Sequence, residues 1–142
     1  MKGDNGVTAK EYLIQSLAIE KLLESKKRLL KKLRAKCESL SSQKFGDKVK
    51  SSAVDSMKTI DRIVDLENEI MSQENSLVMK QKEILEKIQL VCNPTLIAVL
   101  TDKYIIGMSI EQMAEAMNIS RRTACVWHGQ ALQVFRKETG MK

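Results

Sequence analysis

The chain has 142 residues with only one Pro and five aromatic residues, so helix is favoured over sheet and any core must be aliphatic and rich in Met. The net charge of +6 is uneven, because residues 1–40 carry +5, residues 41–93 carry −1 and residues 94–142 carry +2. A basic chain fits a polyanionic partner or a solvated surface, and the absence of an apolar run of ~18 residues argues against a membrane protein.

The first predicted element is a long helix over residues 8–40. Thr8 and Glu11 have the spacing of a capping box, and apolar residues then recur at intervals of three and four. The following segment, residues 41–53, is crowded with Ser, Gly and Lys and is interpreted as a connecting loop.

Residues 26–36, KKRLLKKLRAK, carry seven basic groups and no acidic group. Three interpretations are open for this run. It forms the solvated face of an amphipathic helix, an auxiliary phosphate contact, or a surface that meets Asp61, Asp65 and Glu69 of the next helix.

A second long helix is predicted over residues 54–91. Two adjacent apolar series repeat in it at intervals of seven: Ile63, Ile70, Leu77, Ile84, Val91, and Met57, Val64, Met71, Val78, Leu85, Cys92. Such doublets predict a coiled coil, which requires a partner helix. The partner is either the first helix folded back as a hairpin or the same helix of another chain, so we expect a homodimer or higher oligomer through the long helices.

Asn93 and Pro94 end this helix, because Pro blocks its continuation. They also suit the start of the next helix, where Asn93 is a good cap and Pro94 fits the first helical position. The predicted boundary therefore separates a long-helix region, 1–93, from a C-terminal domain, 94–142. Three short helices are predicted in that domain, over residues 94–106, 110–117 and 121–137, with Ser109 and Ser120 as caps. The predicted fold class is all-α, a long helical hairpin or coiled coil followed by a three-helix helix-turn-helix domain.

The last two predicted helices have the pattern of a helix-turn-helix. Ala114 supplies a small residue at the crossing, and Asn118 supplies a residue that tolerates a left-handed backbone. Apolar residues fill the angle between the helices: Met113, Met117, Ile119, Ala124 and Trp127. The alternative is a helical hairpin with ordinary packing.

In a helix-turn-helix, the exposed face of helix 121–137 enters the DNA major groove. The candidate DNA-binding residues are Ser120, Arg121, Arg122, Thr123, Cys125, Val126 and Gln130. The arginines can bind phosphate or guanine, and Thr123 and Val126 can touch a thymine methyl group. Which arginine reads bases stays open. The single histidine, His128, is interpreted as structural or phosphate-contacting.

An enzymatic function is not expected. Cys37, Cys92 and Cys125 lie far apart without CxxC spacing, which argues against a disulfide scaffold and a zinc site. The sequence contains no carboxylate pair, nucleophile–His pair, glycine-rich phosphate loop or metal cluster. We therefore expect no metal and no cofactor, and the reducing cytosol as the location.

Residues 94–138 resemble region 4 of the sigma-70 family, which binds the promoter −35 element, and the matching residues are SIEQMAEAMNISRRTACVWHGQAL (109–132). The chain lacks the aromatic-rich motif of region 2, which melts the −10 element. Cys125 and Val126 stand where the sigma pattern favours polar or basic readers, which implies a different operator sequence.

The chain also resembles small phage-encoded regulators of the ArpU/RinA type, which activate phage late genes. VDLENEI (64–70), the Asn93-Pro94 junction, SRR (120–122) and HGQAL (128–132) carry this resemblance. It implies a transcriptional regulator in the cytoplasm of a bacterial host, with double-stranded DNA as its partner. Direct contact with host RNA polymerase, and activation as opposed to repression, stay open.

Two other functions compete with this one. Small terminase-like packaging subunits also join a helix-turn-helix to a helical hairpin, although they generally place the DNA-binding unit first. A coiled-coil adaptor that binds only protein would use its C-terminal helices for docking.

Overall fold

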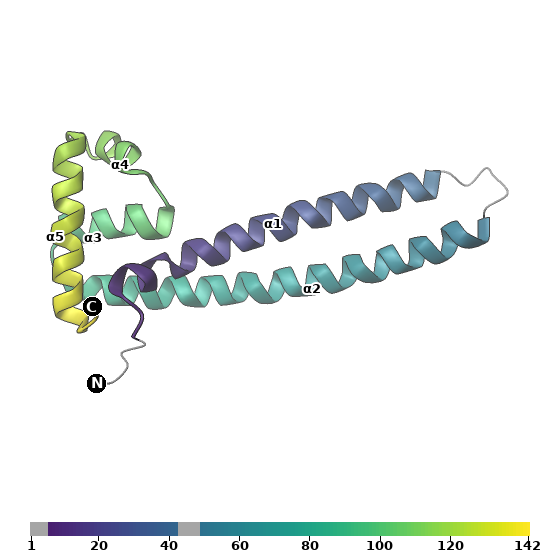
Figure 1. The fold of residues 1–142 in the computed structure, drawn as a ribbon, viewed down its shortest axis with the longest axis horizontal. Coiled ribbons are helices and arrows are strands. Elements are labelled where there is room, and N and C mark those ends of the chain that lie inside the picture. Colours follow the sequence, from purple (N-terminus) through teal and green to yellow (C-terminus); the bar gives the residue numbers. More distant parts are fainter. Residues whose placement is uncertain (1–5, 43–48) are drawn as a thin grey trace. The chain divides into compact units, whose positions relative to one another are not determined.

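The computed structural model describes residues 6–42 and 49–142, with the side chains of residues 6–40 and 54–142. The described residues form helices and no strand, which confirms the predicted all-α class (Figure 1). None of their helices is long and apolar enough to cross a membrane. The chain divides into two compact units, Ile19–Ser76, and Met1–Ala18 together with Leu77–Lys142, which are considered separately.

The unit Ile19–Ser76 is formed by two long helices, α1 (Ala9–Ser42) and α2 (Val49–Ile88), which run side by side in opposite directions (Figure 1). Ion pairs join them: Lys27 Nζ to Glu74 Oε1 at 2.8 Å, Lys26 Nζ to Glu69 Oε2 at 3.1 Å, and Arg34 to Glu67. The long helices therefore pair within one chain. Glu69, one of the three acidic residues that one interpretation of the basic run named, pairs with Lys26, and Glu67 and Glu74, which it did not name, pair with the run as well.

Only one of the two predicted apolar series on α2 lies against α1 in this unit. Ile70 of the first series is buried and Ile63 is half-buried, whereas Met57, Val64 and Met71 of the second series are exposed. The prediction of a seam containing both series is wrong for the second series. Neighbouring residues of a helix point about 100° apart, so a single partner helix covers one series and leaves the other uncovered.

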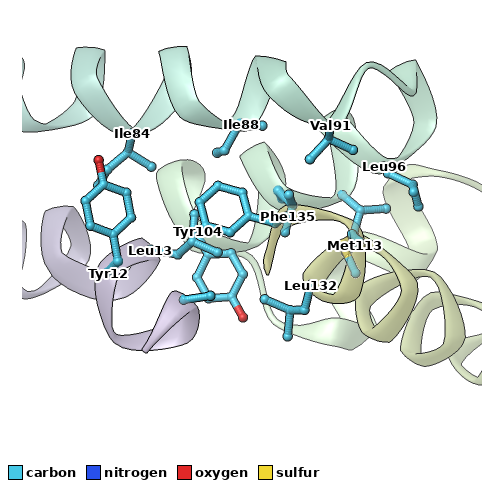
Figure 2. Close-up of a cluster of buried hydrophobic side chains, with 14 of the residues drawn as sticks. Tyr12, Leu13, Ile84, Ile88, Val91, Leu96, Tyr104, Met113, Leu132 and Phe135 are labelled. Carbon is cyan, nitrogen blue, oxygen red and sulfur yellow. The ribbon is translucent and has the colours of Figure 1, made fainter. Parts of the chain in front are cut away.

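The unit Met1–Ala18 with Leu77–Lys142 contains the ends of α1 and α2 and three further α-helices. These are α3 (Pro94–Thr101), α4 (Ile110–Ala116) and α5 (Arg121–Thr139). Their buried side chains form one apolar cluster, shown in Figure 2: Tyr12, Leu13, Ile84, Ile88, Val91, Leu96, Tyr104, Met113, Leu132 and Phe135. The predicted boundary at residue 93 falls inside this unit, because both long helices bury apolar residues against the short ones.

Several helix ends follow from local chemistry. The predicted capping box is present, with the Glu11 N–H donating to Thr8 Oγ1 and the Thr8 N–H donating to Glu11 Oε2. Asn93 Oδ1 accepts from the N–H groups of Thr95 and Leu96, which confirms the predicted cap of α3.

Other ends differ from the prediction. Residues 41–42 and 49–53 of the predicted loop are helical, since Ser lowers helix propensity only slightly, and residues 43–48 lie outside the described residues. The second helix ends at Ile88 and is followed by the 3₁₀ turn η1 (Gln89–Val91).

The predicted helix 94–106 continues past α3 as the π turn η2 (Asp102–Ile106). Gly107 ends it with φ 88°, a left-handed conformation that favours glycine. An added Cβ at this glycine would also lie 3.1 Å from Leu17 Cδ2.

The different burial of the two series on α2 predicts unequal effects of truncation. Ile84 of the first series is 0% exposed and Val78 of the second is 63% exposed. We expect Ile84→Ala to lower the free energy of unfolding by about 2–4 kcal/mol, and Val78→Ala to change it by less than about 0.5 kcal/mol. Equal losses in denaturant unfolding curves would contradict the assignment.

Candidate nucleic-acid interface

The helix α4 begins at a reciprocal cap. The Gln112 N–H donates to Ser109 Oγ at 3.1 Å, and the Ser109 N–H donates to Gln112 Oε1 at 2.9 Å. This is the capping box that the sequence predicts at Ser109, and it satisfies two backbone donors that a helix start leaves free.

The turn between α4 and α5 depends on Asn118. Its φ of 55° is left-handed, as predicted, and its N–H donates to the Glu115 carbonyl at 3.2 Å. The Ile119 N–H donates to the Ala114 carbonyl at 2.9 Å. These two bonds form a Schellman motif, which ends α4 sharply and directs the chain into α5.

Small buried residues bring α4 and α5 together. Ala114 and Ala124 are buried, as is the Met113 side chain, which Figure 2 shows within the apolar cluster. Met117, Ile119 and Trp127 are partly buried and pack against the same cluster. All of the apolar residues that the sequence placed in the angle between the two helices therefore lie in or against the core.

The opposite face of α5 is a continuous exposed stripe. Its members are Arg121, Arg122, Cys125, Val126, Gly129, Gln130 and Gln133. They recur at steps of one, three, one, three, one and three residues, which places them along one side of a helix. We call this set the α5 stripe. It contains five of the seven predicted DNA-binding residues, and it adds Gly129 and Gln133, which lie on the same side of the helix.

The other two predicted contact residues, Ser120 and Thr123, form the cap of α5. Ser120 Oγ accepts from the Thr123 N–H at 3.1 Å and donates to Thr123 Oγ1 at 2.8 Å. Thr123 is also half-buried. The two hydroxyl groups are hydrogen-bonded to each other, so these residues order the first turn of α5. The remaining free N–H groups of that turn point outward.

The two arginines at the start of α5 differ in their partners. Arg121 Nε donates to Glu111 Oε1 at 2.7 Å, in an ion pair that is exposed to solvent. The pKa of the Glu111 carboxyl lies below its usual value. The main cause is a hydrogen bond from the backbone N–H of Glu111 itself, and the second is the hydrogen bond from Arg121. Arg122 is exposed and has no acidic partner among the described residues. The Glu111 contact was missed from the sequence, because it depends on the angle between α4 and α5.

His128 lies on the half-buried flank of α5. Its Nε2 is 2.7 Å from the Tyr104 hydroxyl, and the two rings are 5.6 Å apart. Desolvation, and then the charges of Lys103 and Lys10, lower the pKa of the imidazole, while burial raises the pKa of Tyr104 to about 12. The Nε2 of a neutral ring can accept a hydrogen bond from the Tyr104 hydroxyl, so His128 packs as a neutral structural residue.

This geometry predicts a pH dependence of stability. His128 has a lower pKa in the folded chain than its ordinary value near 6.5, so the unfolded chain binds the proton first. Stability is therefore complete above this pH and falls as the pH decreases through about 6.5 towards the folded pKa. We expect a melting temperature that falls between pH 7.5 and 5.5, and a smaller fall in His128→Gln. Parallel curves for the two proteins would refute this role.

Gly129 occupies the middle of α5 without an internal packing reason. No heavy atom lies within 4 Å of a Cβ built at this position. Glycine in a helix interior costs about 1 kcal/mol relative to alanine, so we expect Gly129→Ala to stabilise the isolated chain by up to this amount in thermal unfolding. A destabilised variant would mean that the neighbouring side chains pack more tightly than this structure shows.

The described residues offer no cluster of metal ligands. They contain no group of three or more His, Cys, Asp or Glu side chains that could hold a metal ion. Cys37, Cys92 and Cys125 are free thiols. The α5 stripe is thus the candidate site that the structure supports best.

Comparison with known proteins gives one match. Residues 39–136 match a family described as "Protein of unknown function (DUF1492)", and the matched range includes all of α2, α3 and α4 and most of α5. No curated protein and no solved structure matches the chain.

Proposed function

The chain belongs to the DUF1492 family, whose function is unknown, and we propose that it binds double-stranded DNA sequence-specifically and regulates transcription. The α5 stripe carries this proposal. It presents two arginines, two glutamines and small or apolar side chains on the outward face of a helix that a Schellman turn joins to α4. The second helix of a helix-turn-helix uses this face, starting from its N-terminal residues, to contact base edges in the major groove.

The residues of the stripe fit different parts of a DNA site. Arg122, which lacks an acidic partner among the described residues, suits a bidentate contact to guanine or a phosphate. Gln130 suits adenine, and Val126 suits a thymine methyl group. Arg121 stays near Glu111 and suits a phosphate contact. Gly129 leaves room for the close approach of a base or sugar.

The resemblance of this region to sigma region 4 and to phage late-gene activators favours transcription of phage or prophage genes as the process. A basic chain is consistent with DNA as partner, because cations contribute the sequence-independent part of the affinity. Packaging of DNA and binding to protein alone are the competing functions. The measurements described next separate them from the proposed function.

Selection from a pool of random duplexes by the full chain tests the proposal. We expect a recovered motif, whose affinity falls about 10- to 100-fold in Arg122→Ala with relaxed preference at one base pair. Lys137→Ala is the matched control, since it removes one exposed positive charge near the other end of α5. It should change the affinity much less.

Three outcomes contradict the proposal. Motif-free binding that Arg122→Ala leaves unchanged would move the polyanion contact to the basic run of α1. Unchanged DNA migration at low salt would favour the protein-binding adaptor. A ring of about eight or more subunits in light scattering, without a motif, would favour a packaging subunit.

A further inference from the structure

Three large apolar side chains form an exposed row on α2 within the unit Ile19–Ser76. Met57, Val64 and Met71 are 67%, 47% and 64% exposed. They lie at intervals of seven residues and do not belong to the series that packs against α1. Three such residues lie in one row along the helix, and no other part of the described unit covers them.

The row has the spacing of a second coiled-coil seam. Asp61 and Asn68 fall between its apolar members, so the positions 57, 61, 64, 68 and 71 alternate steps of four and three residues. A seven-residue repeat stays in line along a helix only if that helix is supercoiled. The first series, which faces α1, has the same seven-residue repeat. Supercoiling of α2 around α1 therefore keeps each of the two rows on one side of α2 along its length.

We propose that this row binds the same row of a second copy of the chain, with the two α2 helices antiparallel. The row reads the same in both directions, as Met, Val, Met. Around a two-fold axis at Val64, each Met57 faces Met71 of the second copy, and the two Val64 side chains face each other. A two-fold dimer requires such a self-complementary surface.

The polar positions favour this orientation. In the antiparallel pair each Asp61 faces Asn68 of the second copy, so its carboxylate accepts a hydrogen bond from the amide. In a parallel pair the two Asp61 carboxylates would face each other and repel. Neither Asp61 nor Asn68 makes a hydrogen bond or ion pair within the described part of the chain, so both are free for this contact.

The acidic residues on one side of the row are compatible with a second copy. Glu67 and Glu74 flank it, and they already pair with Arg34 and Lys27 of α1. Their repulsion across the two-fold axis is therefore reduced. The stretch from residue 57 to residue 71 is only about 21 Å long, so the interface is small and we expect a reversible, concentration-dependent dimer.

Sedimentation of the full chain over a concentration series tests the surface. Val64→Glu places a charge at the two-fold axis twice per dimer and should weaken dimerisation by at least about tenfold. Leu22→Glu is the matched control, because Leu22 is 48% exposed in the same unit but lies on α1. It should leave the dimer unchanged. A monomeric wild type, or a dimer that Val64→Glu does not weaken, would overturn the proposal.

Disulfide cross-linking of the full chain tests the orientation, with the three native cysteines replaced by serine and helicity checked by circular dichroism. Val64→Cys alone should form a linked dimer. Asp61→Cys and Asn68→Cys should cross-link with each other when mixed, and much less when alone. Efficient linkage of each alone, without gain on mixing, would show a parallel pair and overturn the antiparallel assignment. This inference does not depend on DNA binding.

Discussion

The burial of Phe135 fixes the orientation of α5, and with it the side of this helix that is exposed. Phe135 is fully buried, and its ring stacks on Tyr12 of α1 at 6.4 Å between centroids. Figure 2 shows it among the labelled side chains of the apolar cluster. Ala124, Ala131 and Leu132 lie on the same side of α5 and are also buried. Because one side of the helix is held in this way, the α5 stripe must face outward.

A related constraint governs α2. A helix of a two-helix hairpin has one neighbour, so it buries one apolar row, and a second row remains exposed unless another molecule covers it. The sequence pattern showed both rows, but the hairpin explains only the row that contains Ile63 and Ile70. An antiparallel second copy explains the spacing of the other row and the polar residues within it.

Features that depend on a few neighbouring residues could be predicted from the sequence. The caps at Thr8, Asn93, Ser109 and Ser120 and the left-handed Asn118 are examples, since each is fixed within one turn of the chain. Contacts between distant segments could not be predicted in this way. The Glu111–Arg121 ion pair and the Tyr104–His128 contact depend on how the helices pack. The position of residues 77–93 also depends on packing. Apolar side chains at the end of α2 belong to the same buried cluster as those of the C-terminal helices, so these residues lie in the C-terminal unit.

The measurement that tests the DNA-binding account most directly is an NMR titration of the full chain with a duplex obtained by selection. The account predicts that the largest changes in amide chemical shift occur along the α5 stripe, at Arg122, Val126 and Gln130, and that they diminish in Arg122→Ala. Changes confined to the basic run of α1, with the α5 stripe unaffected, would contradict it.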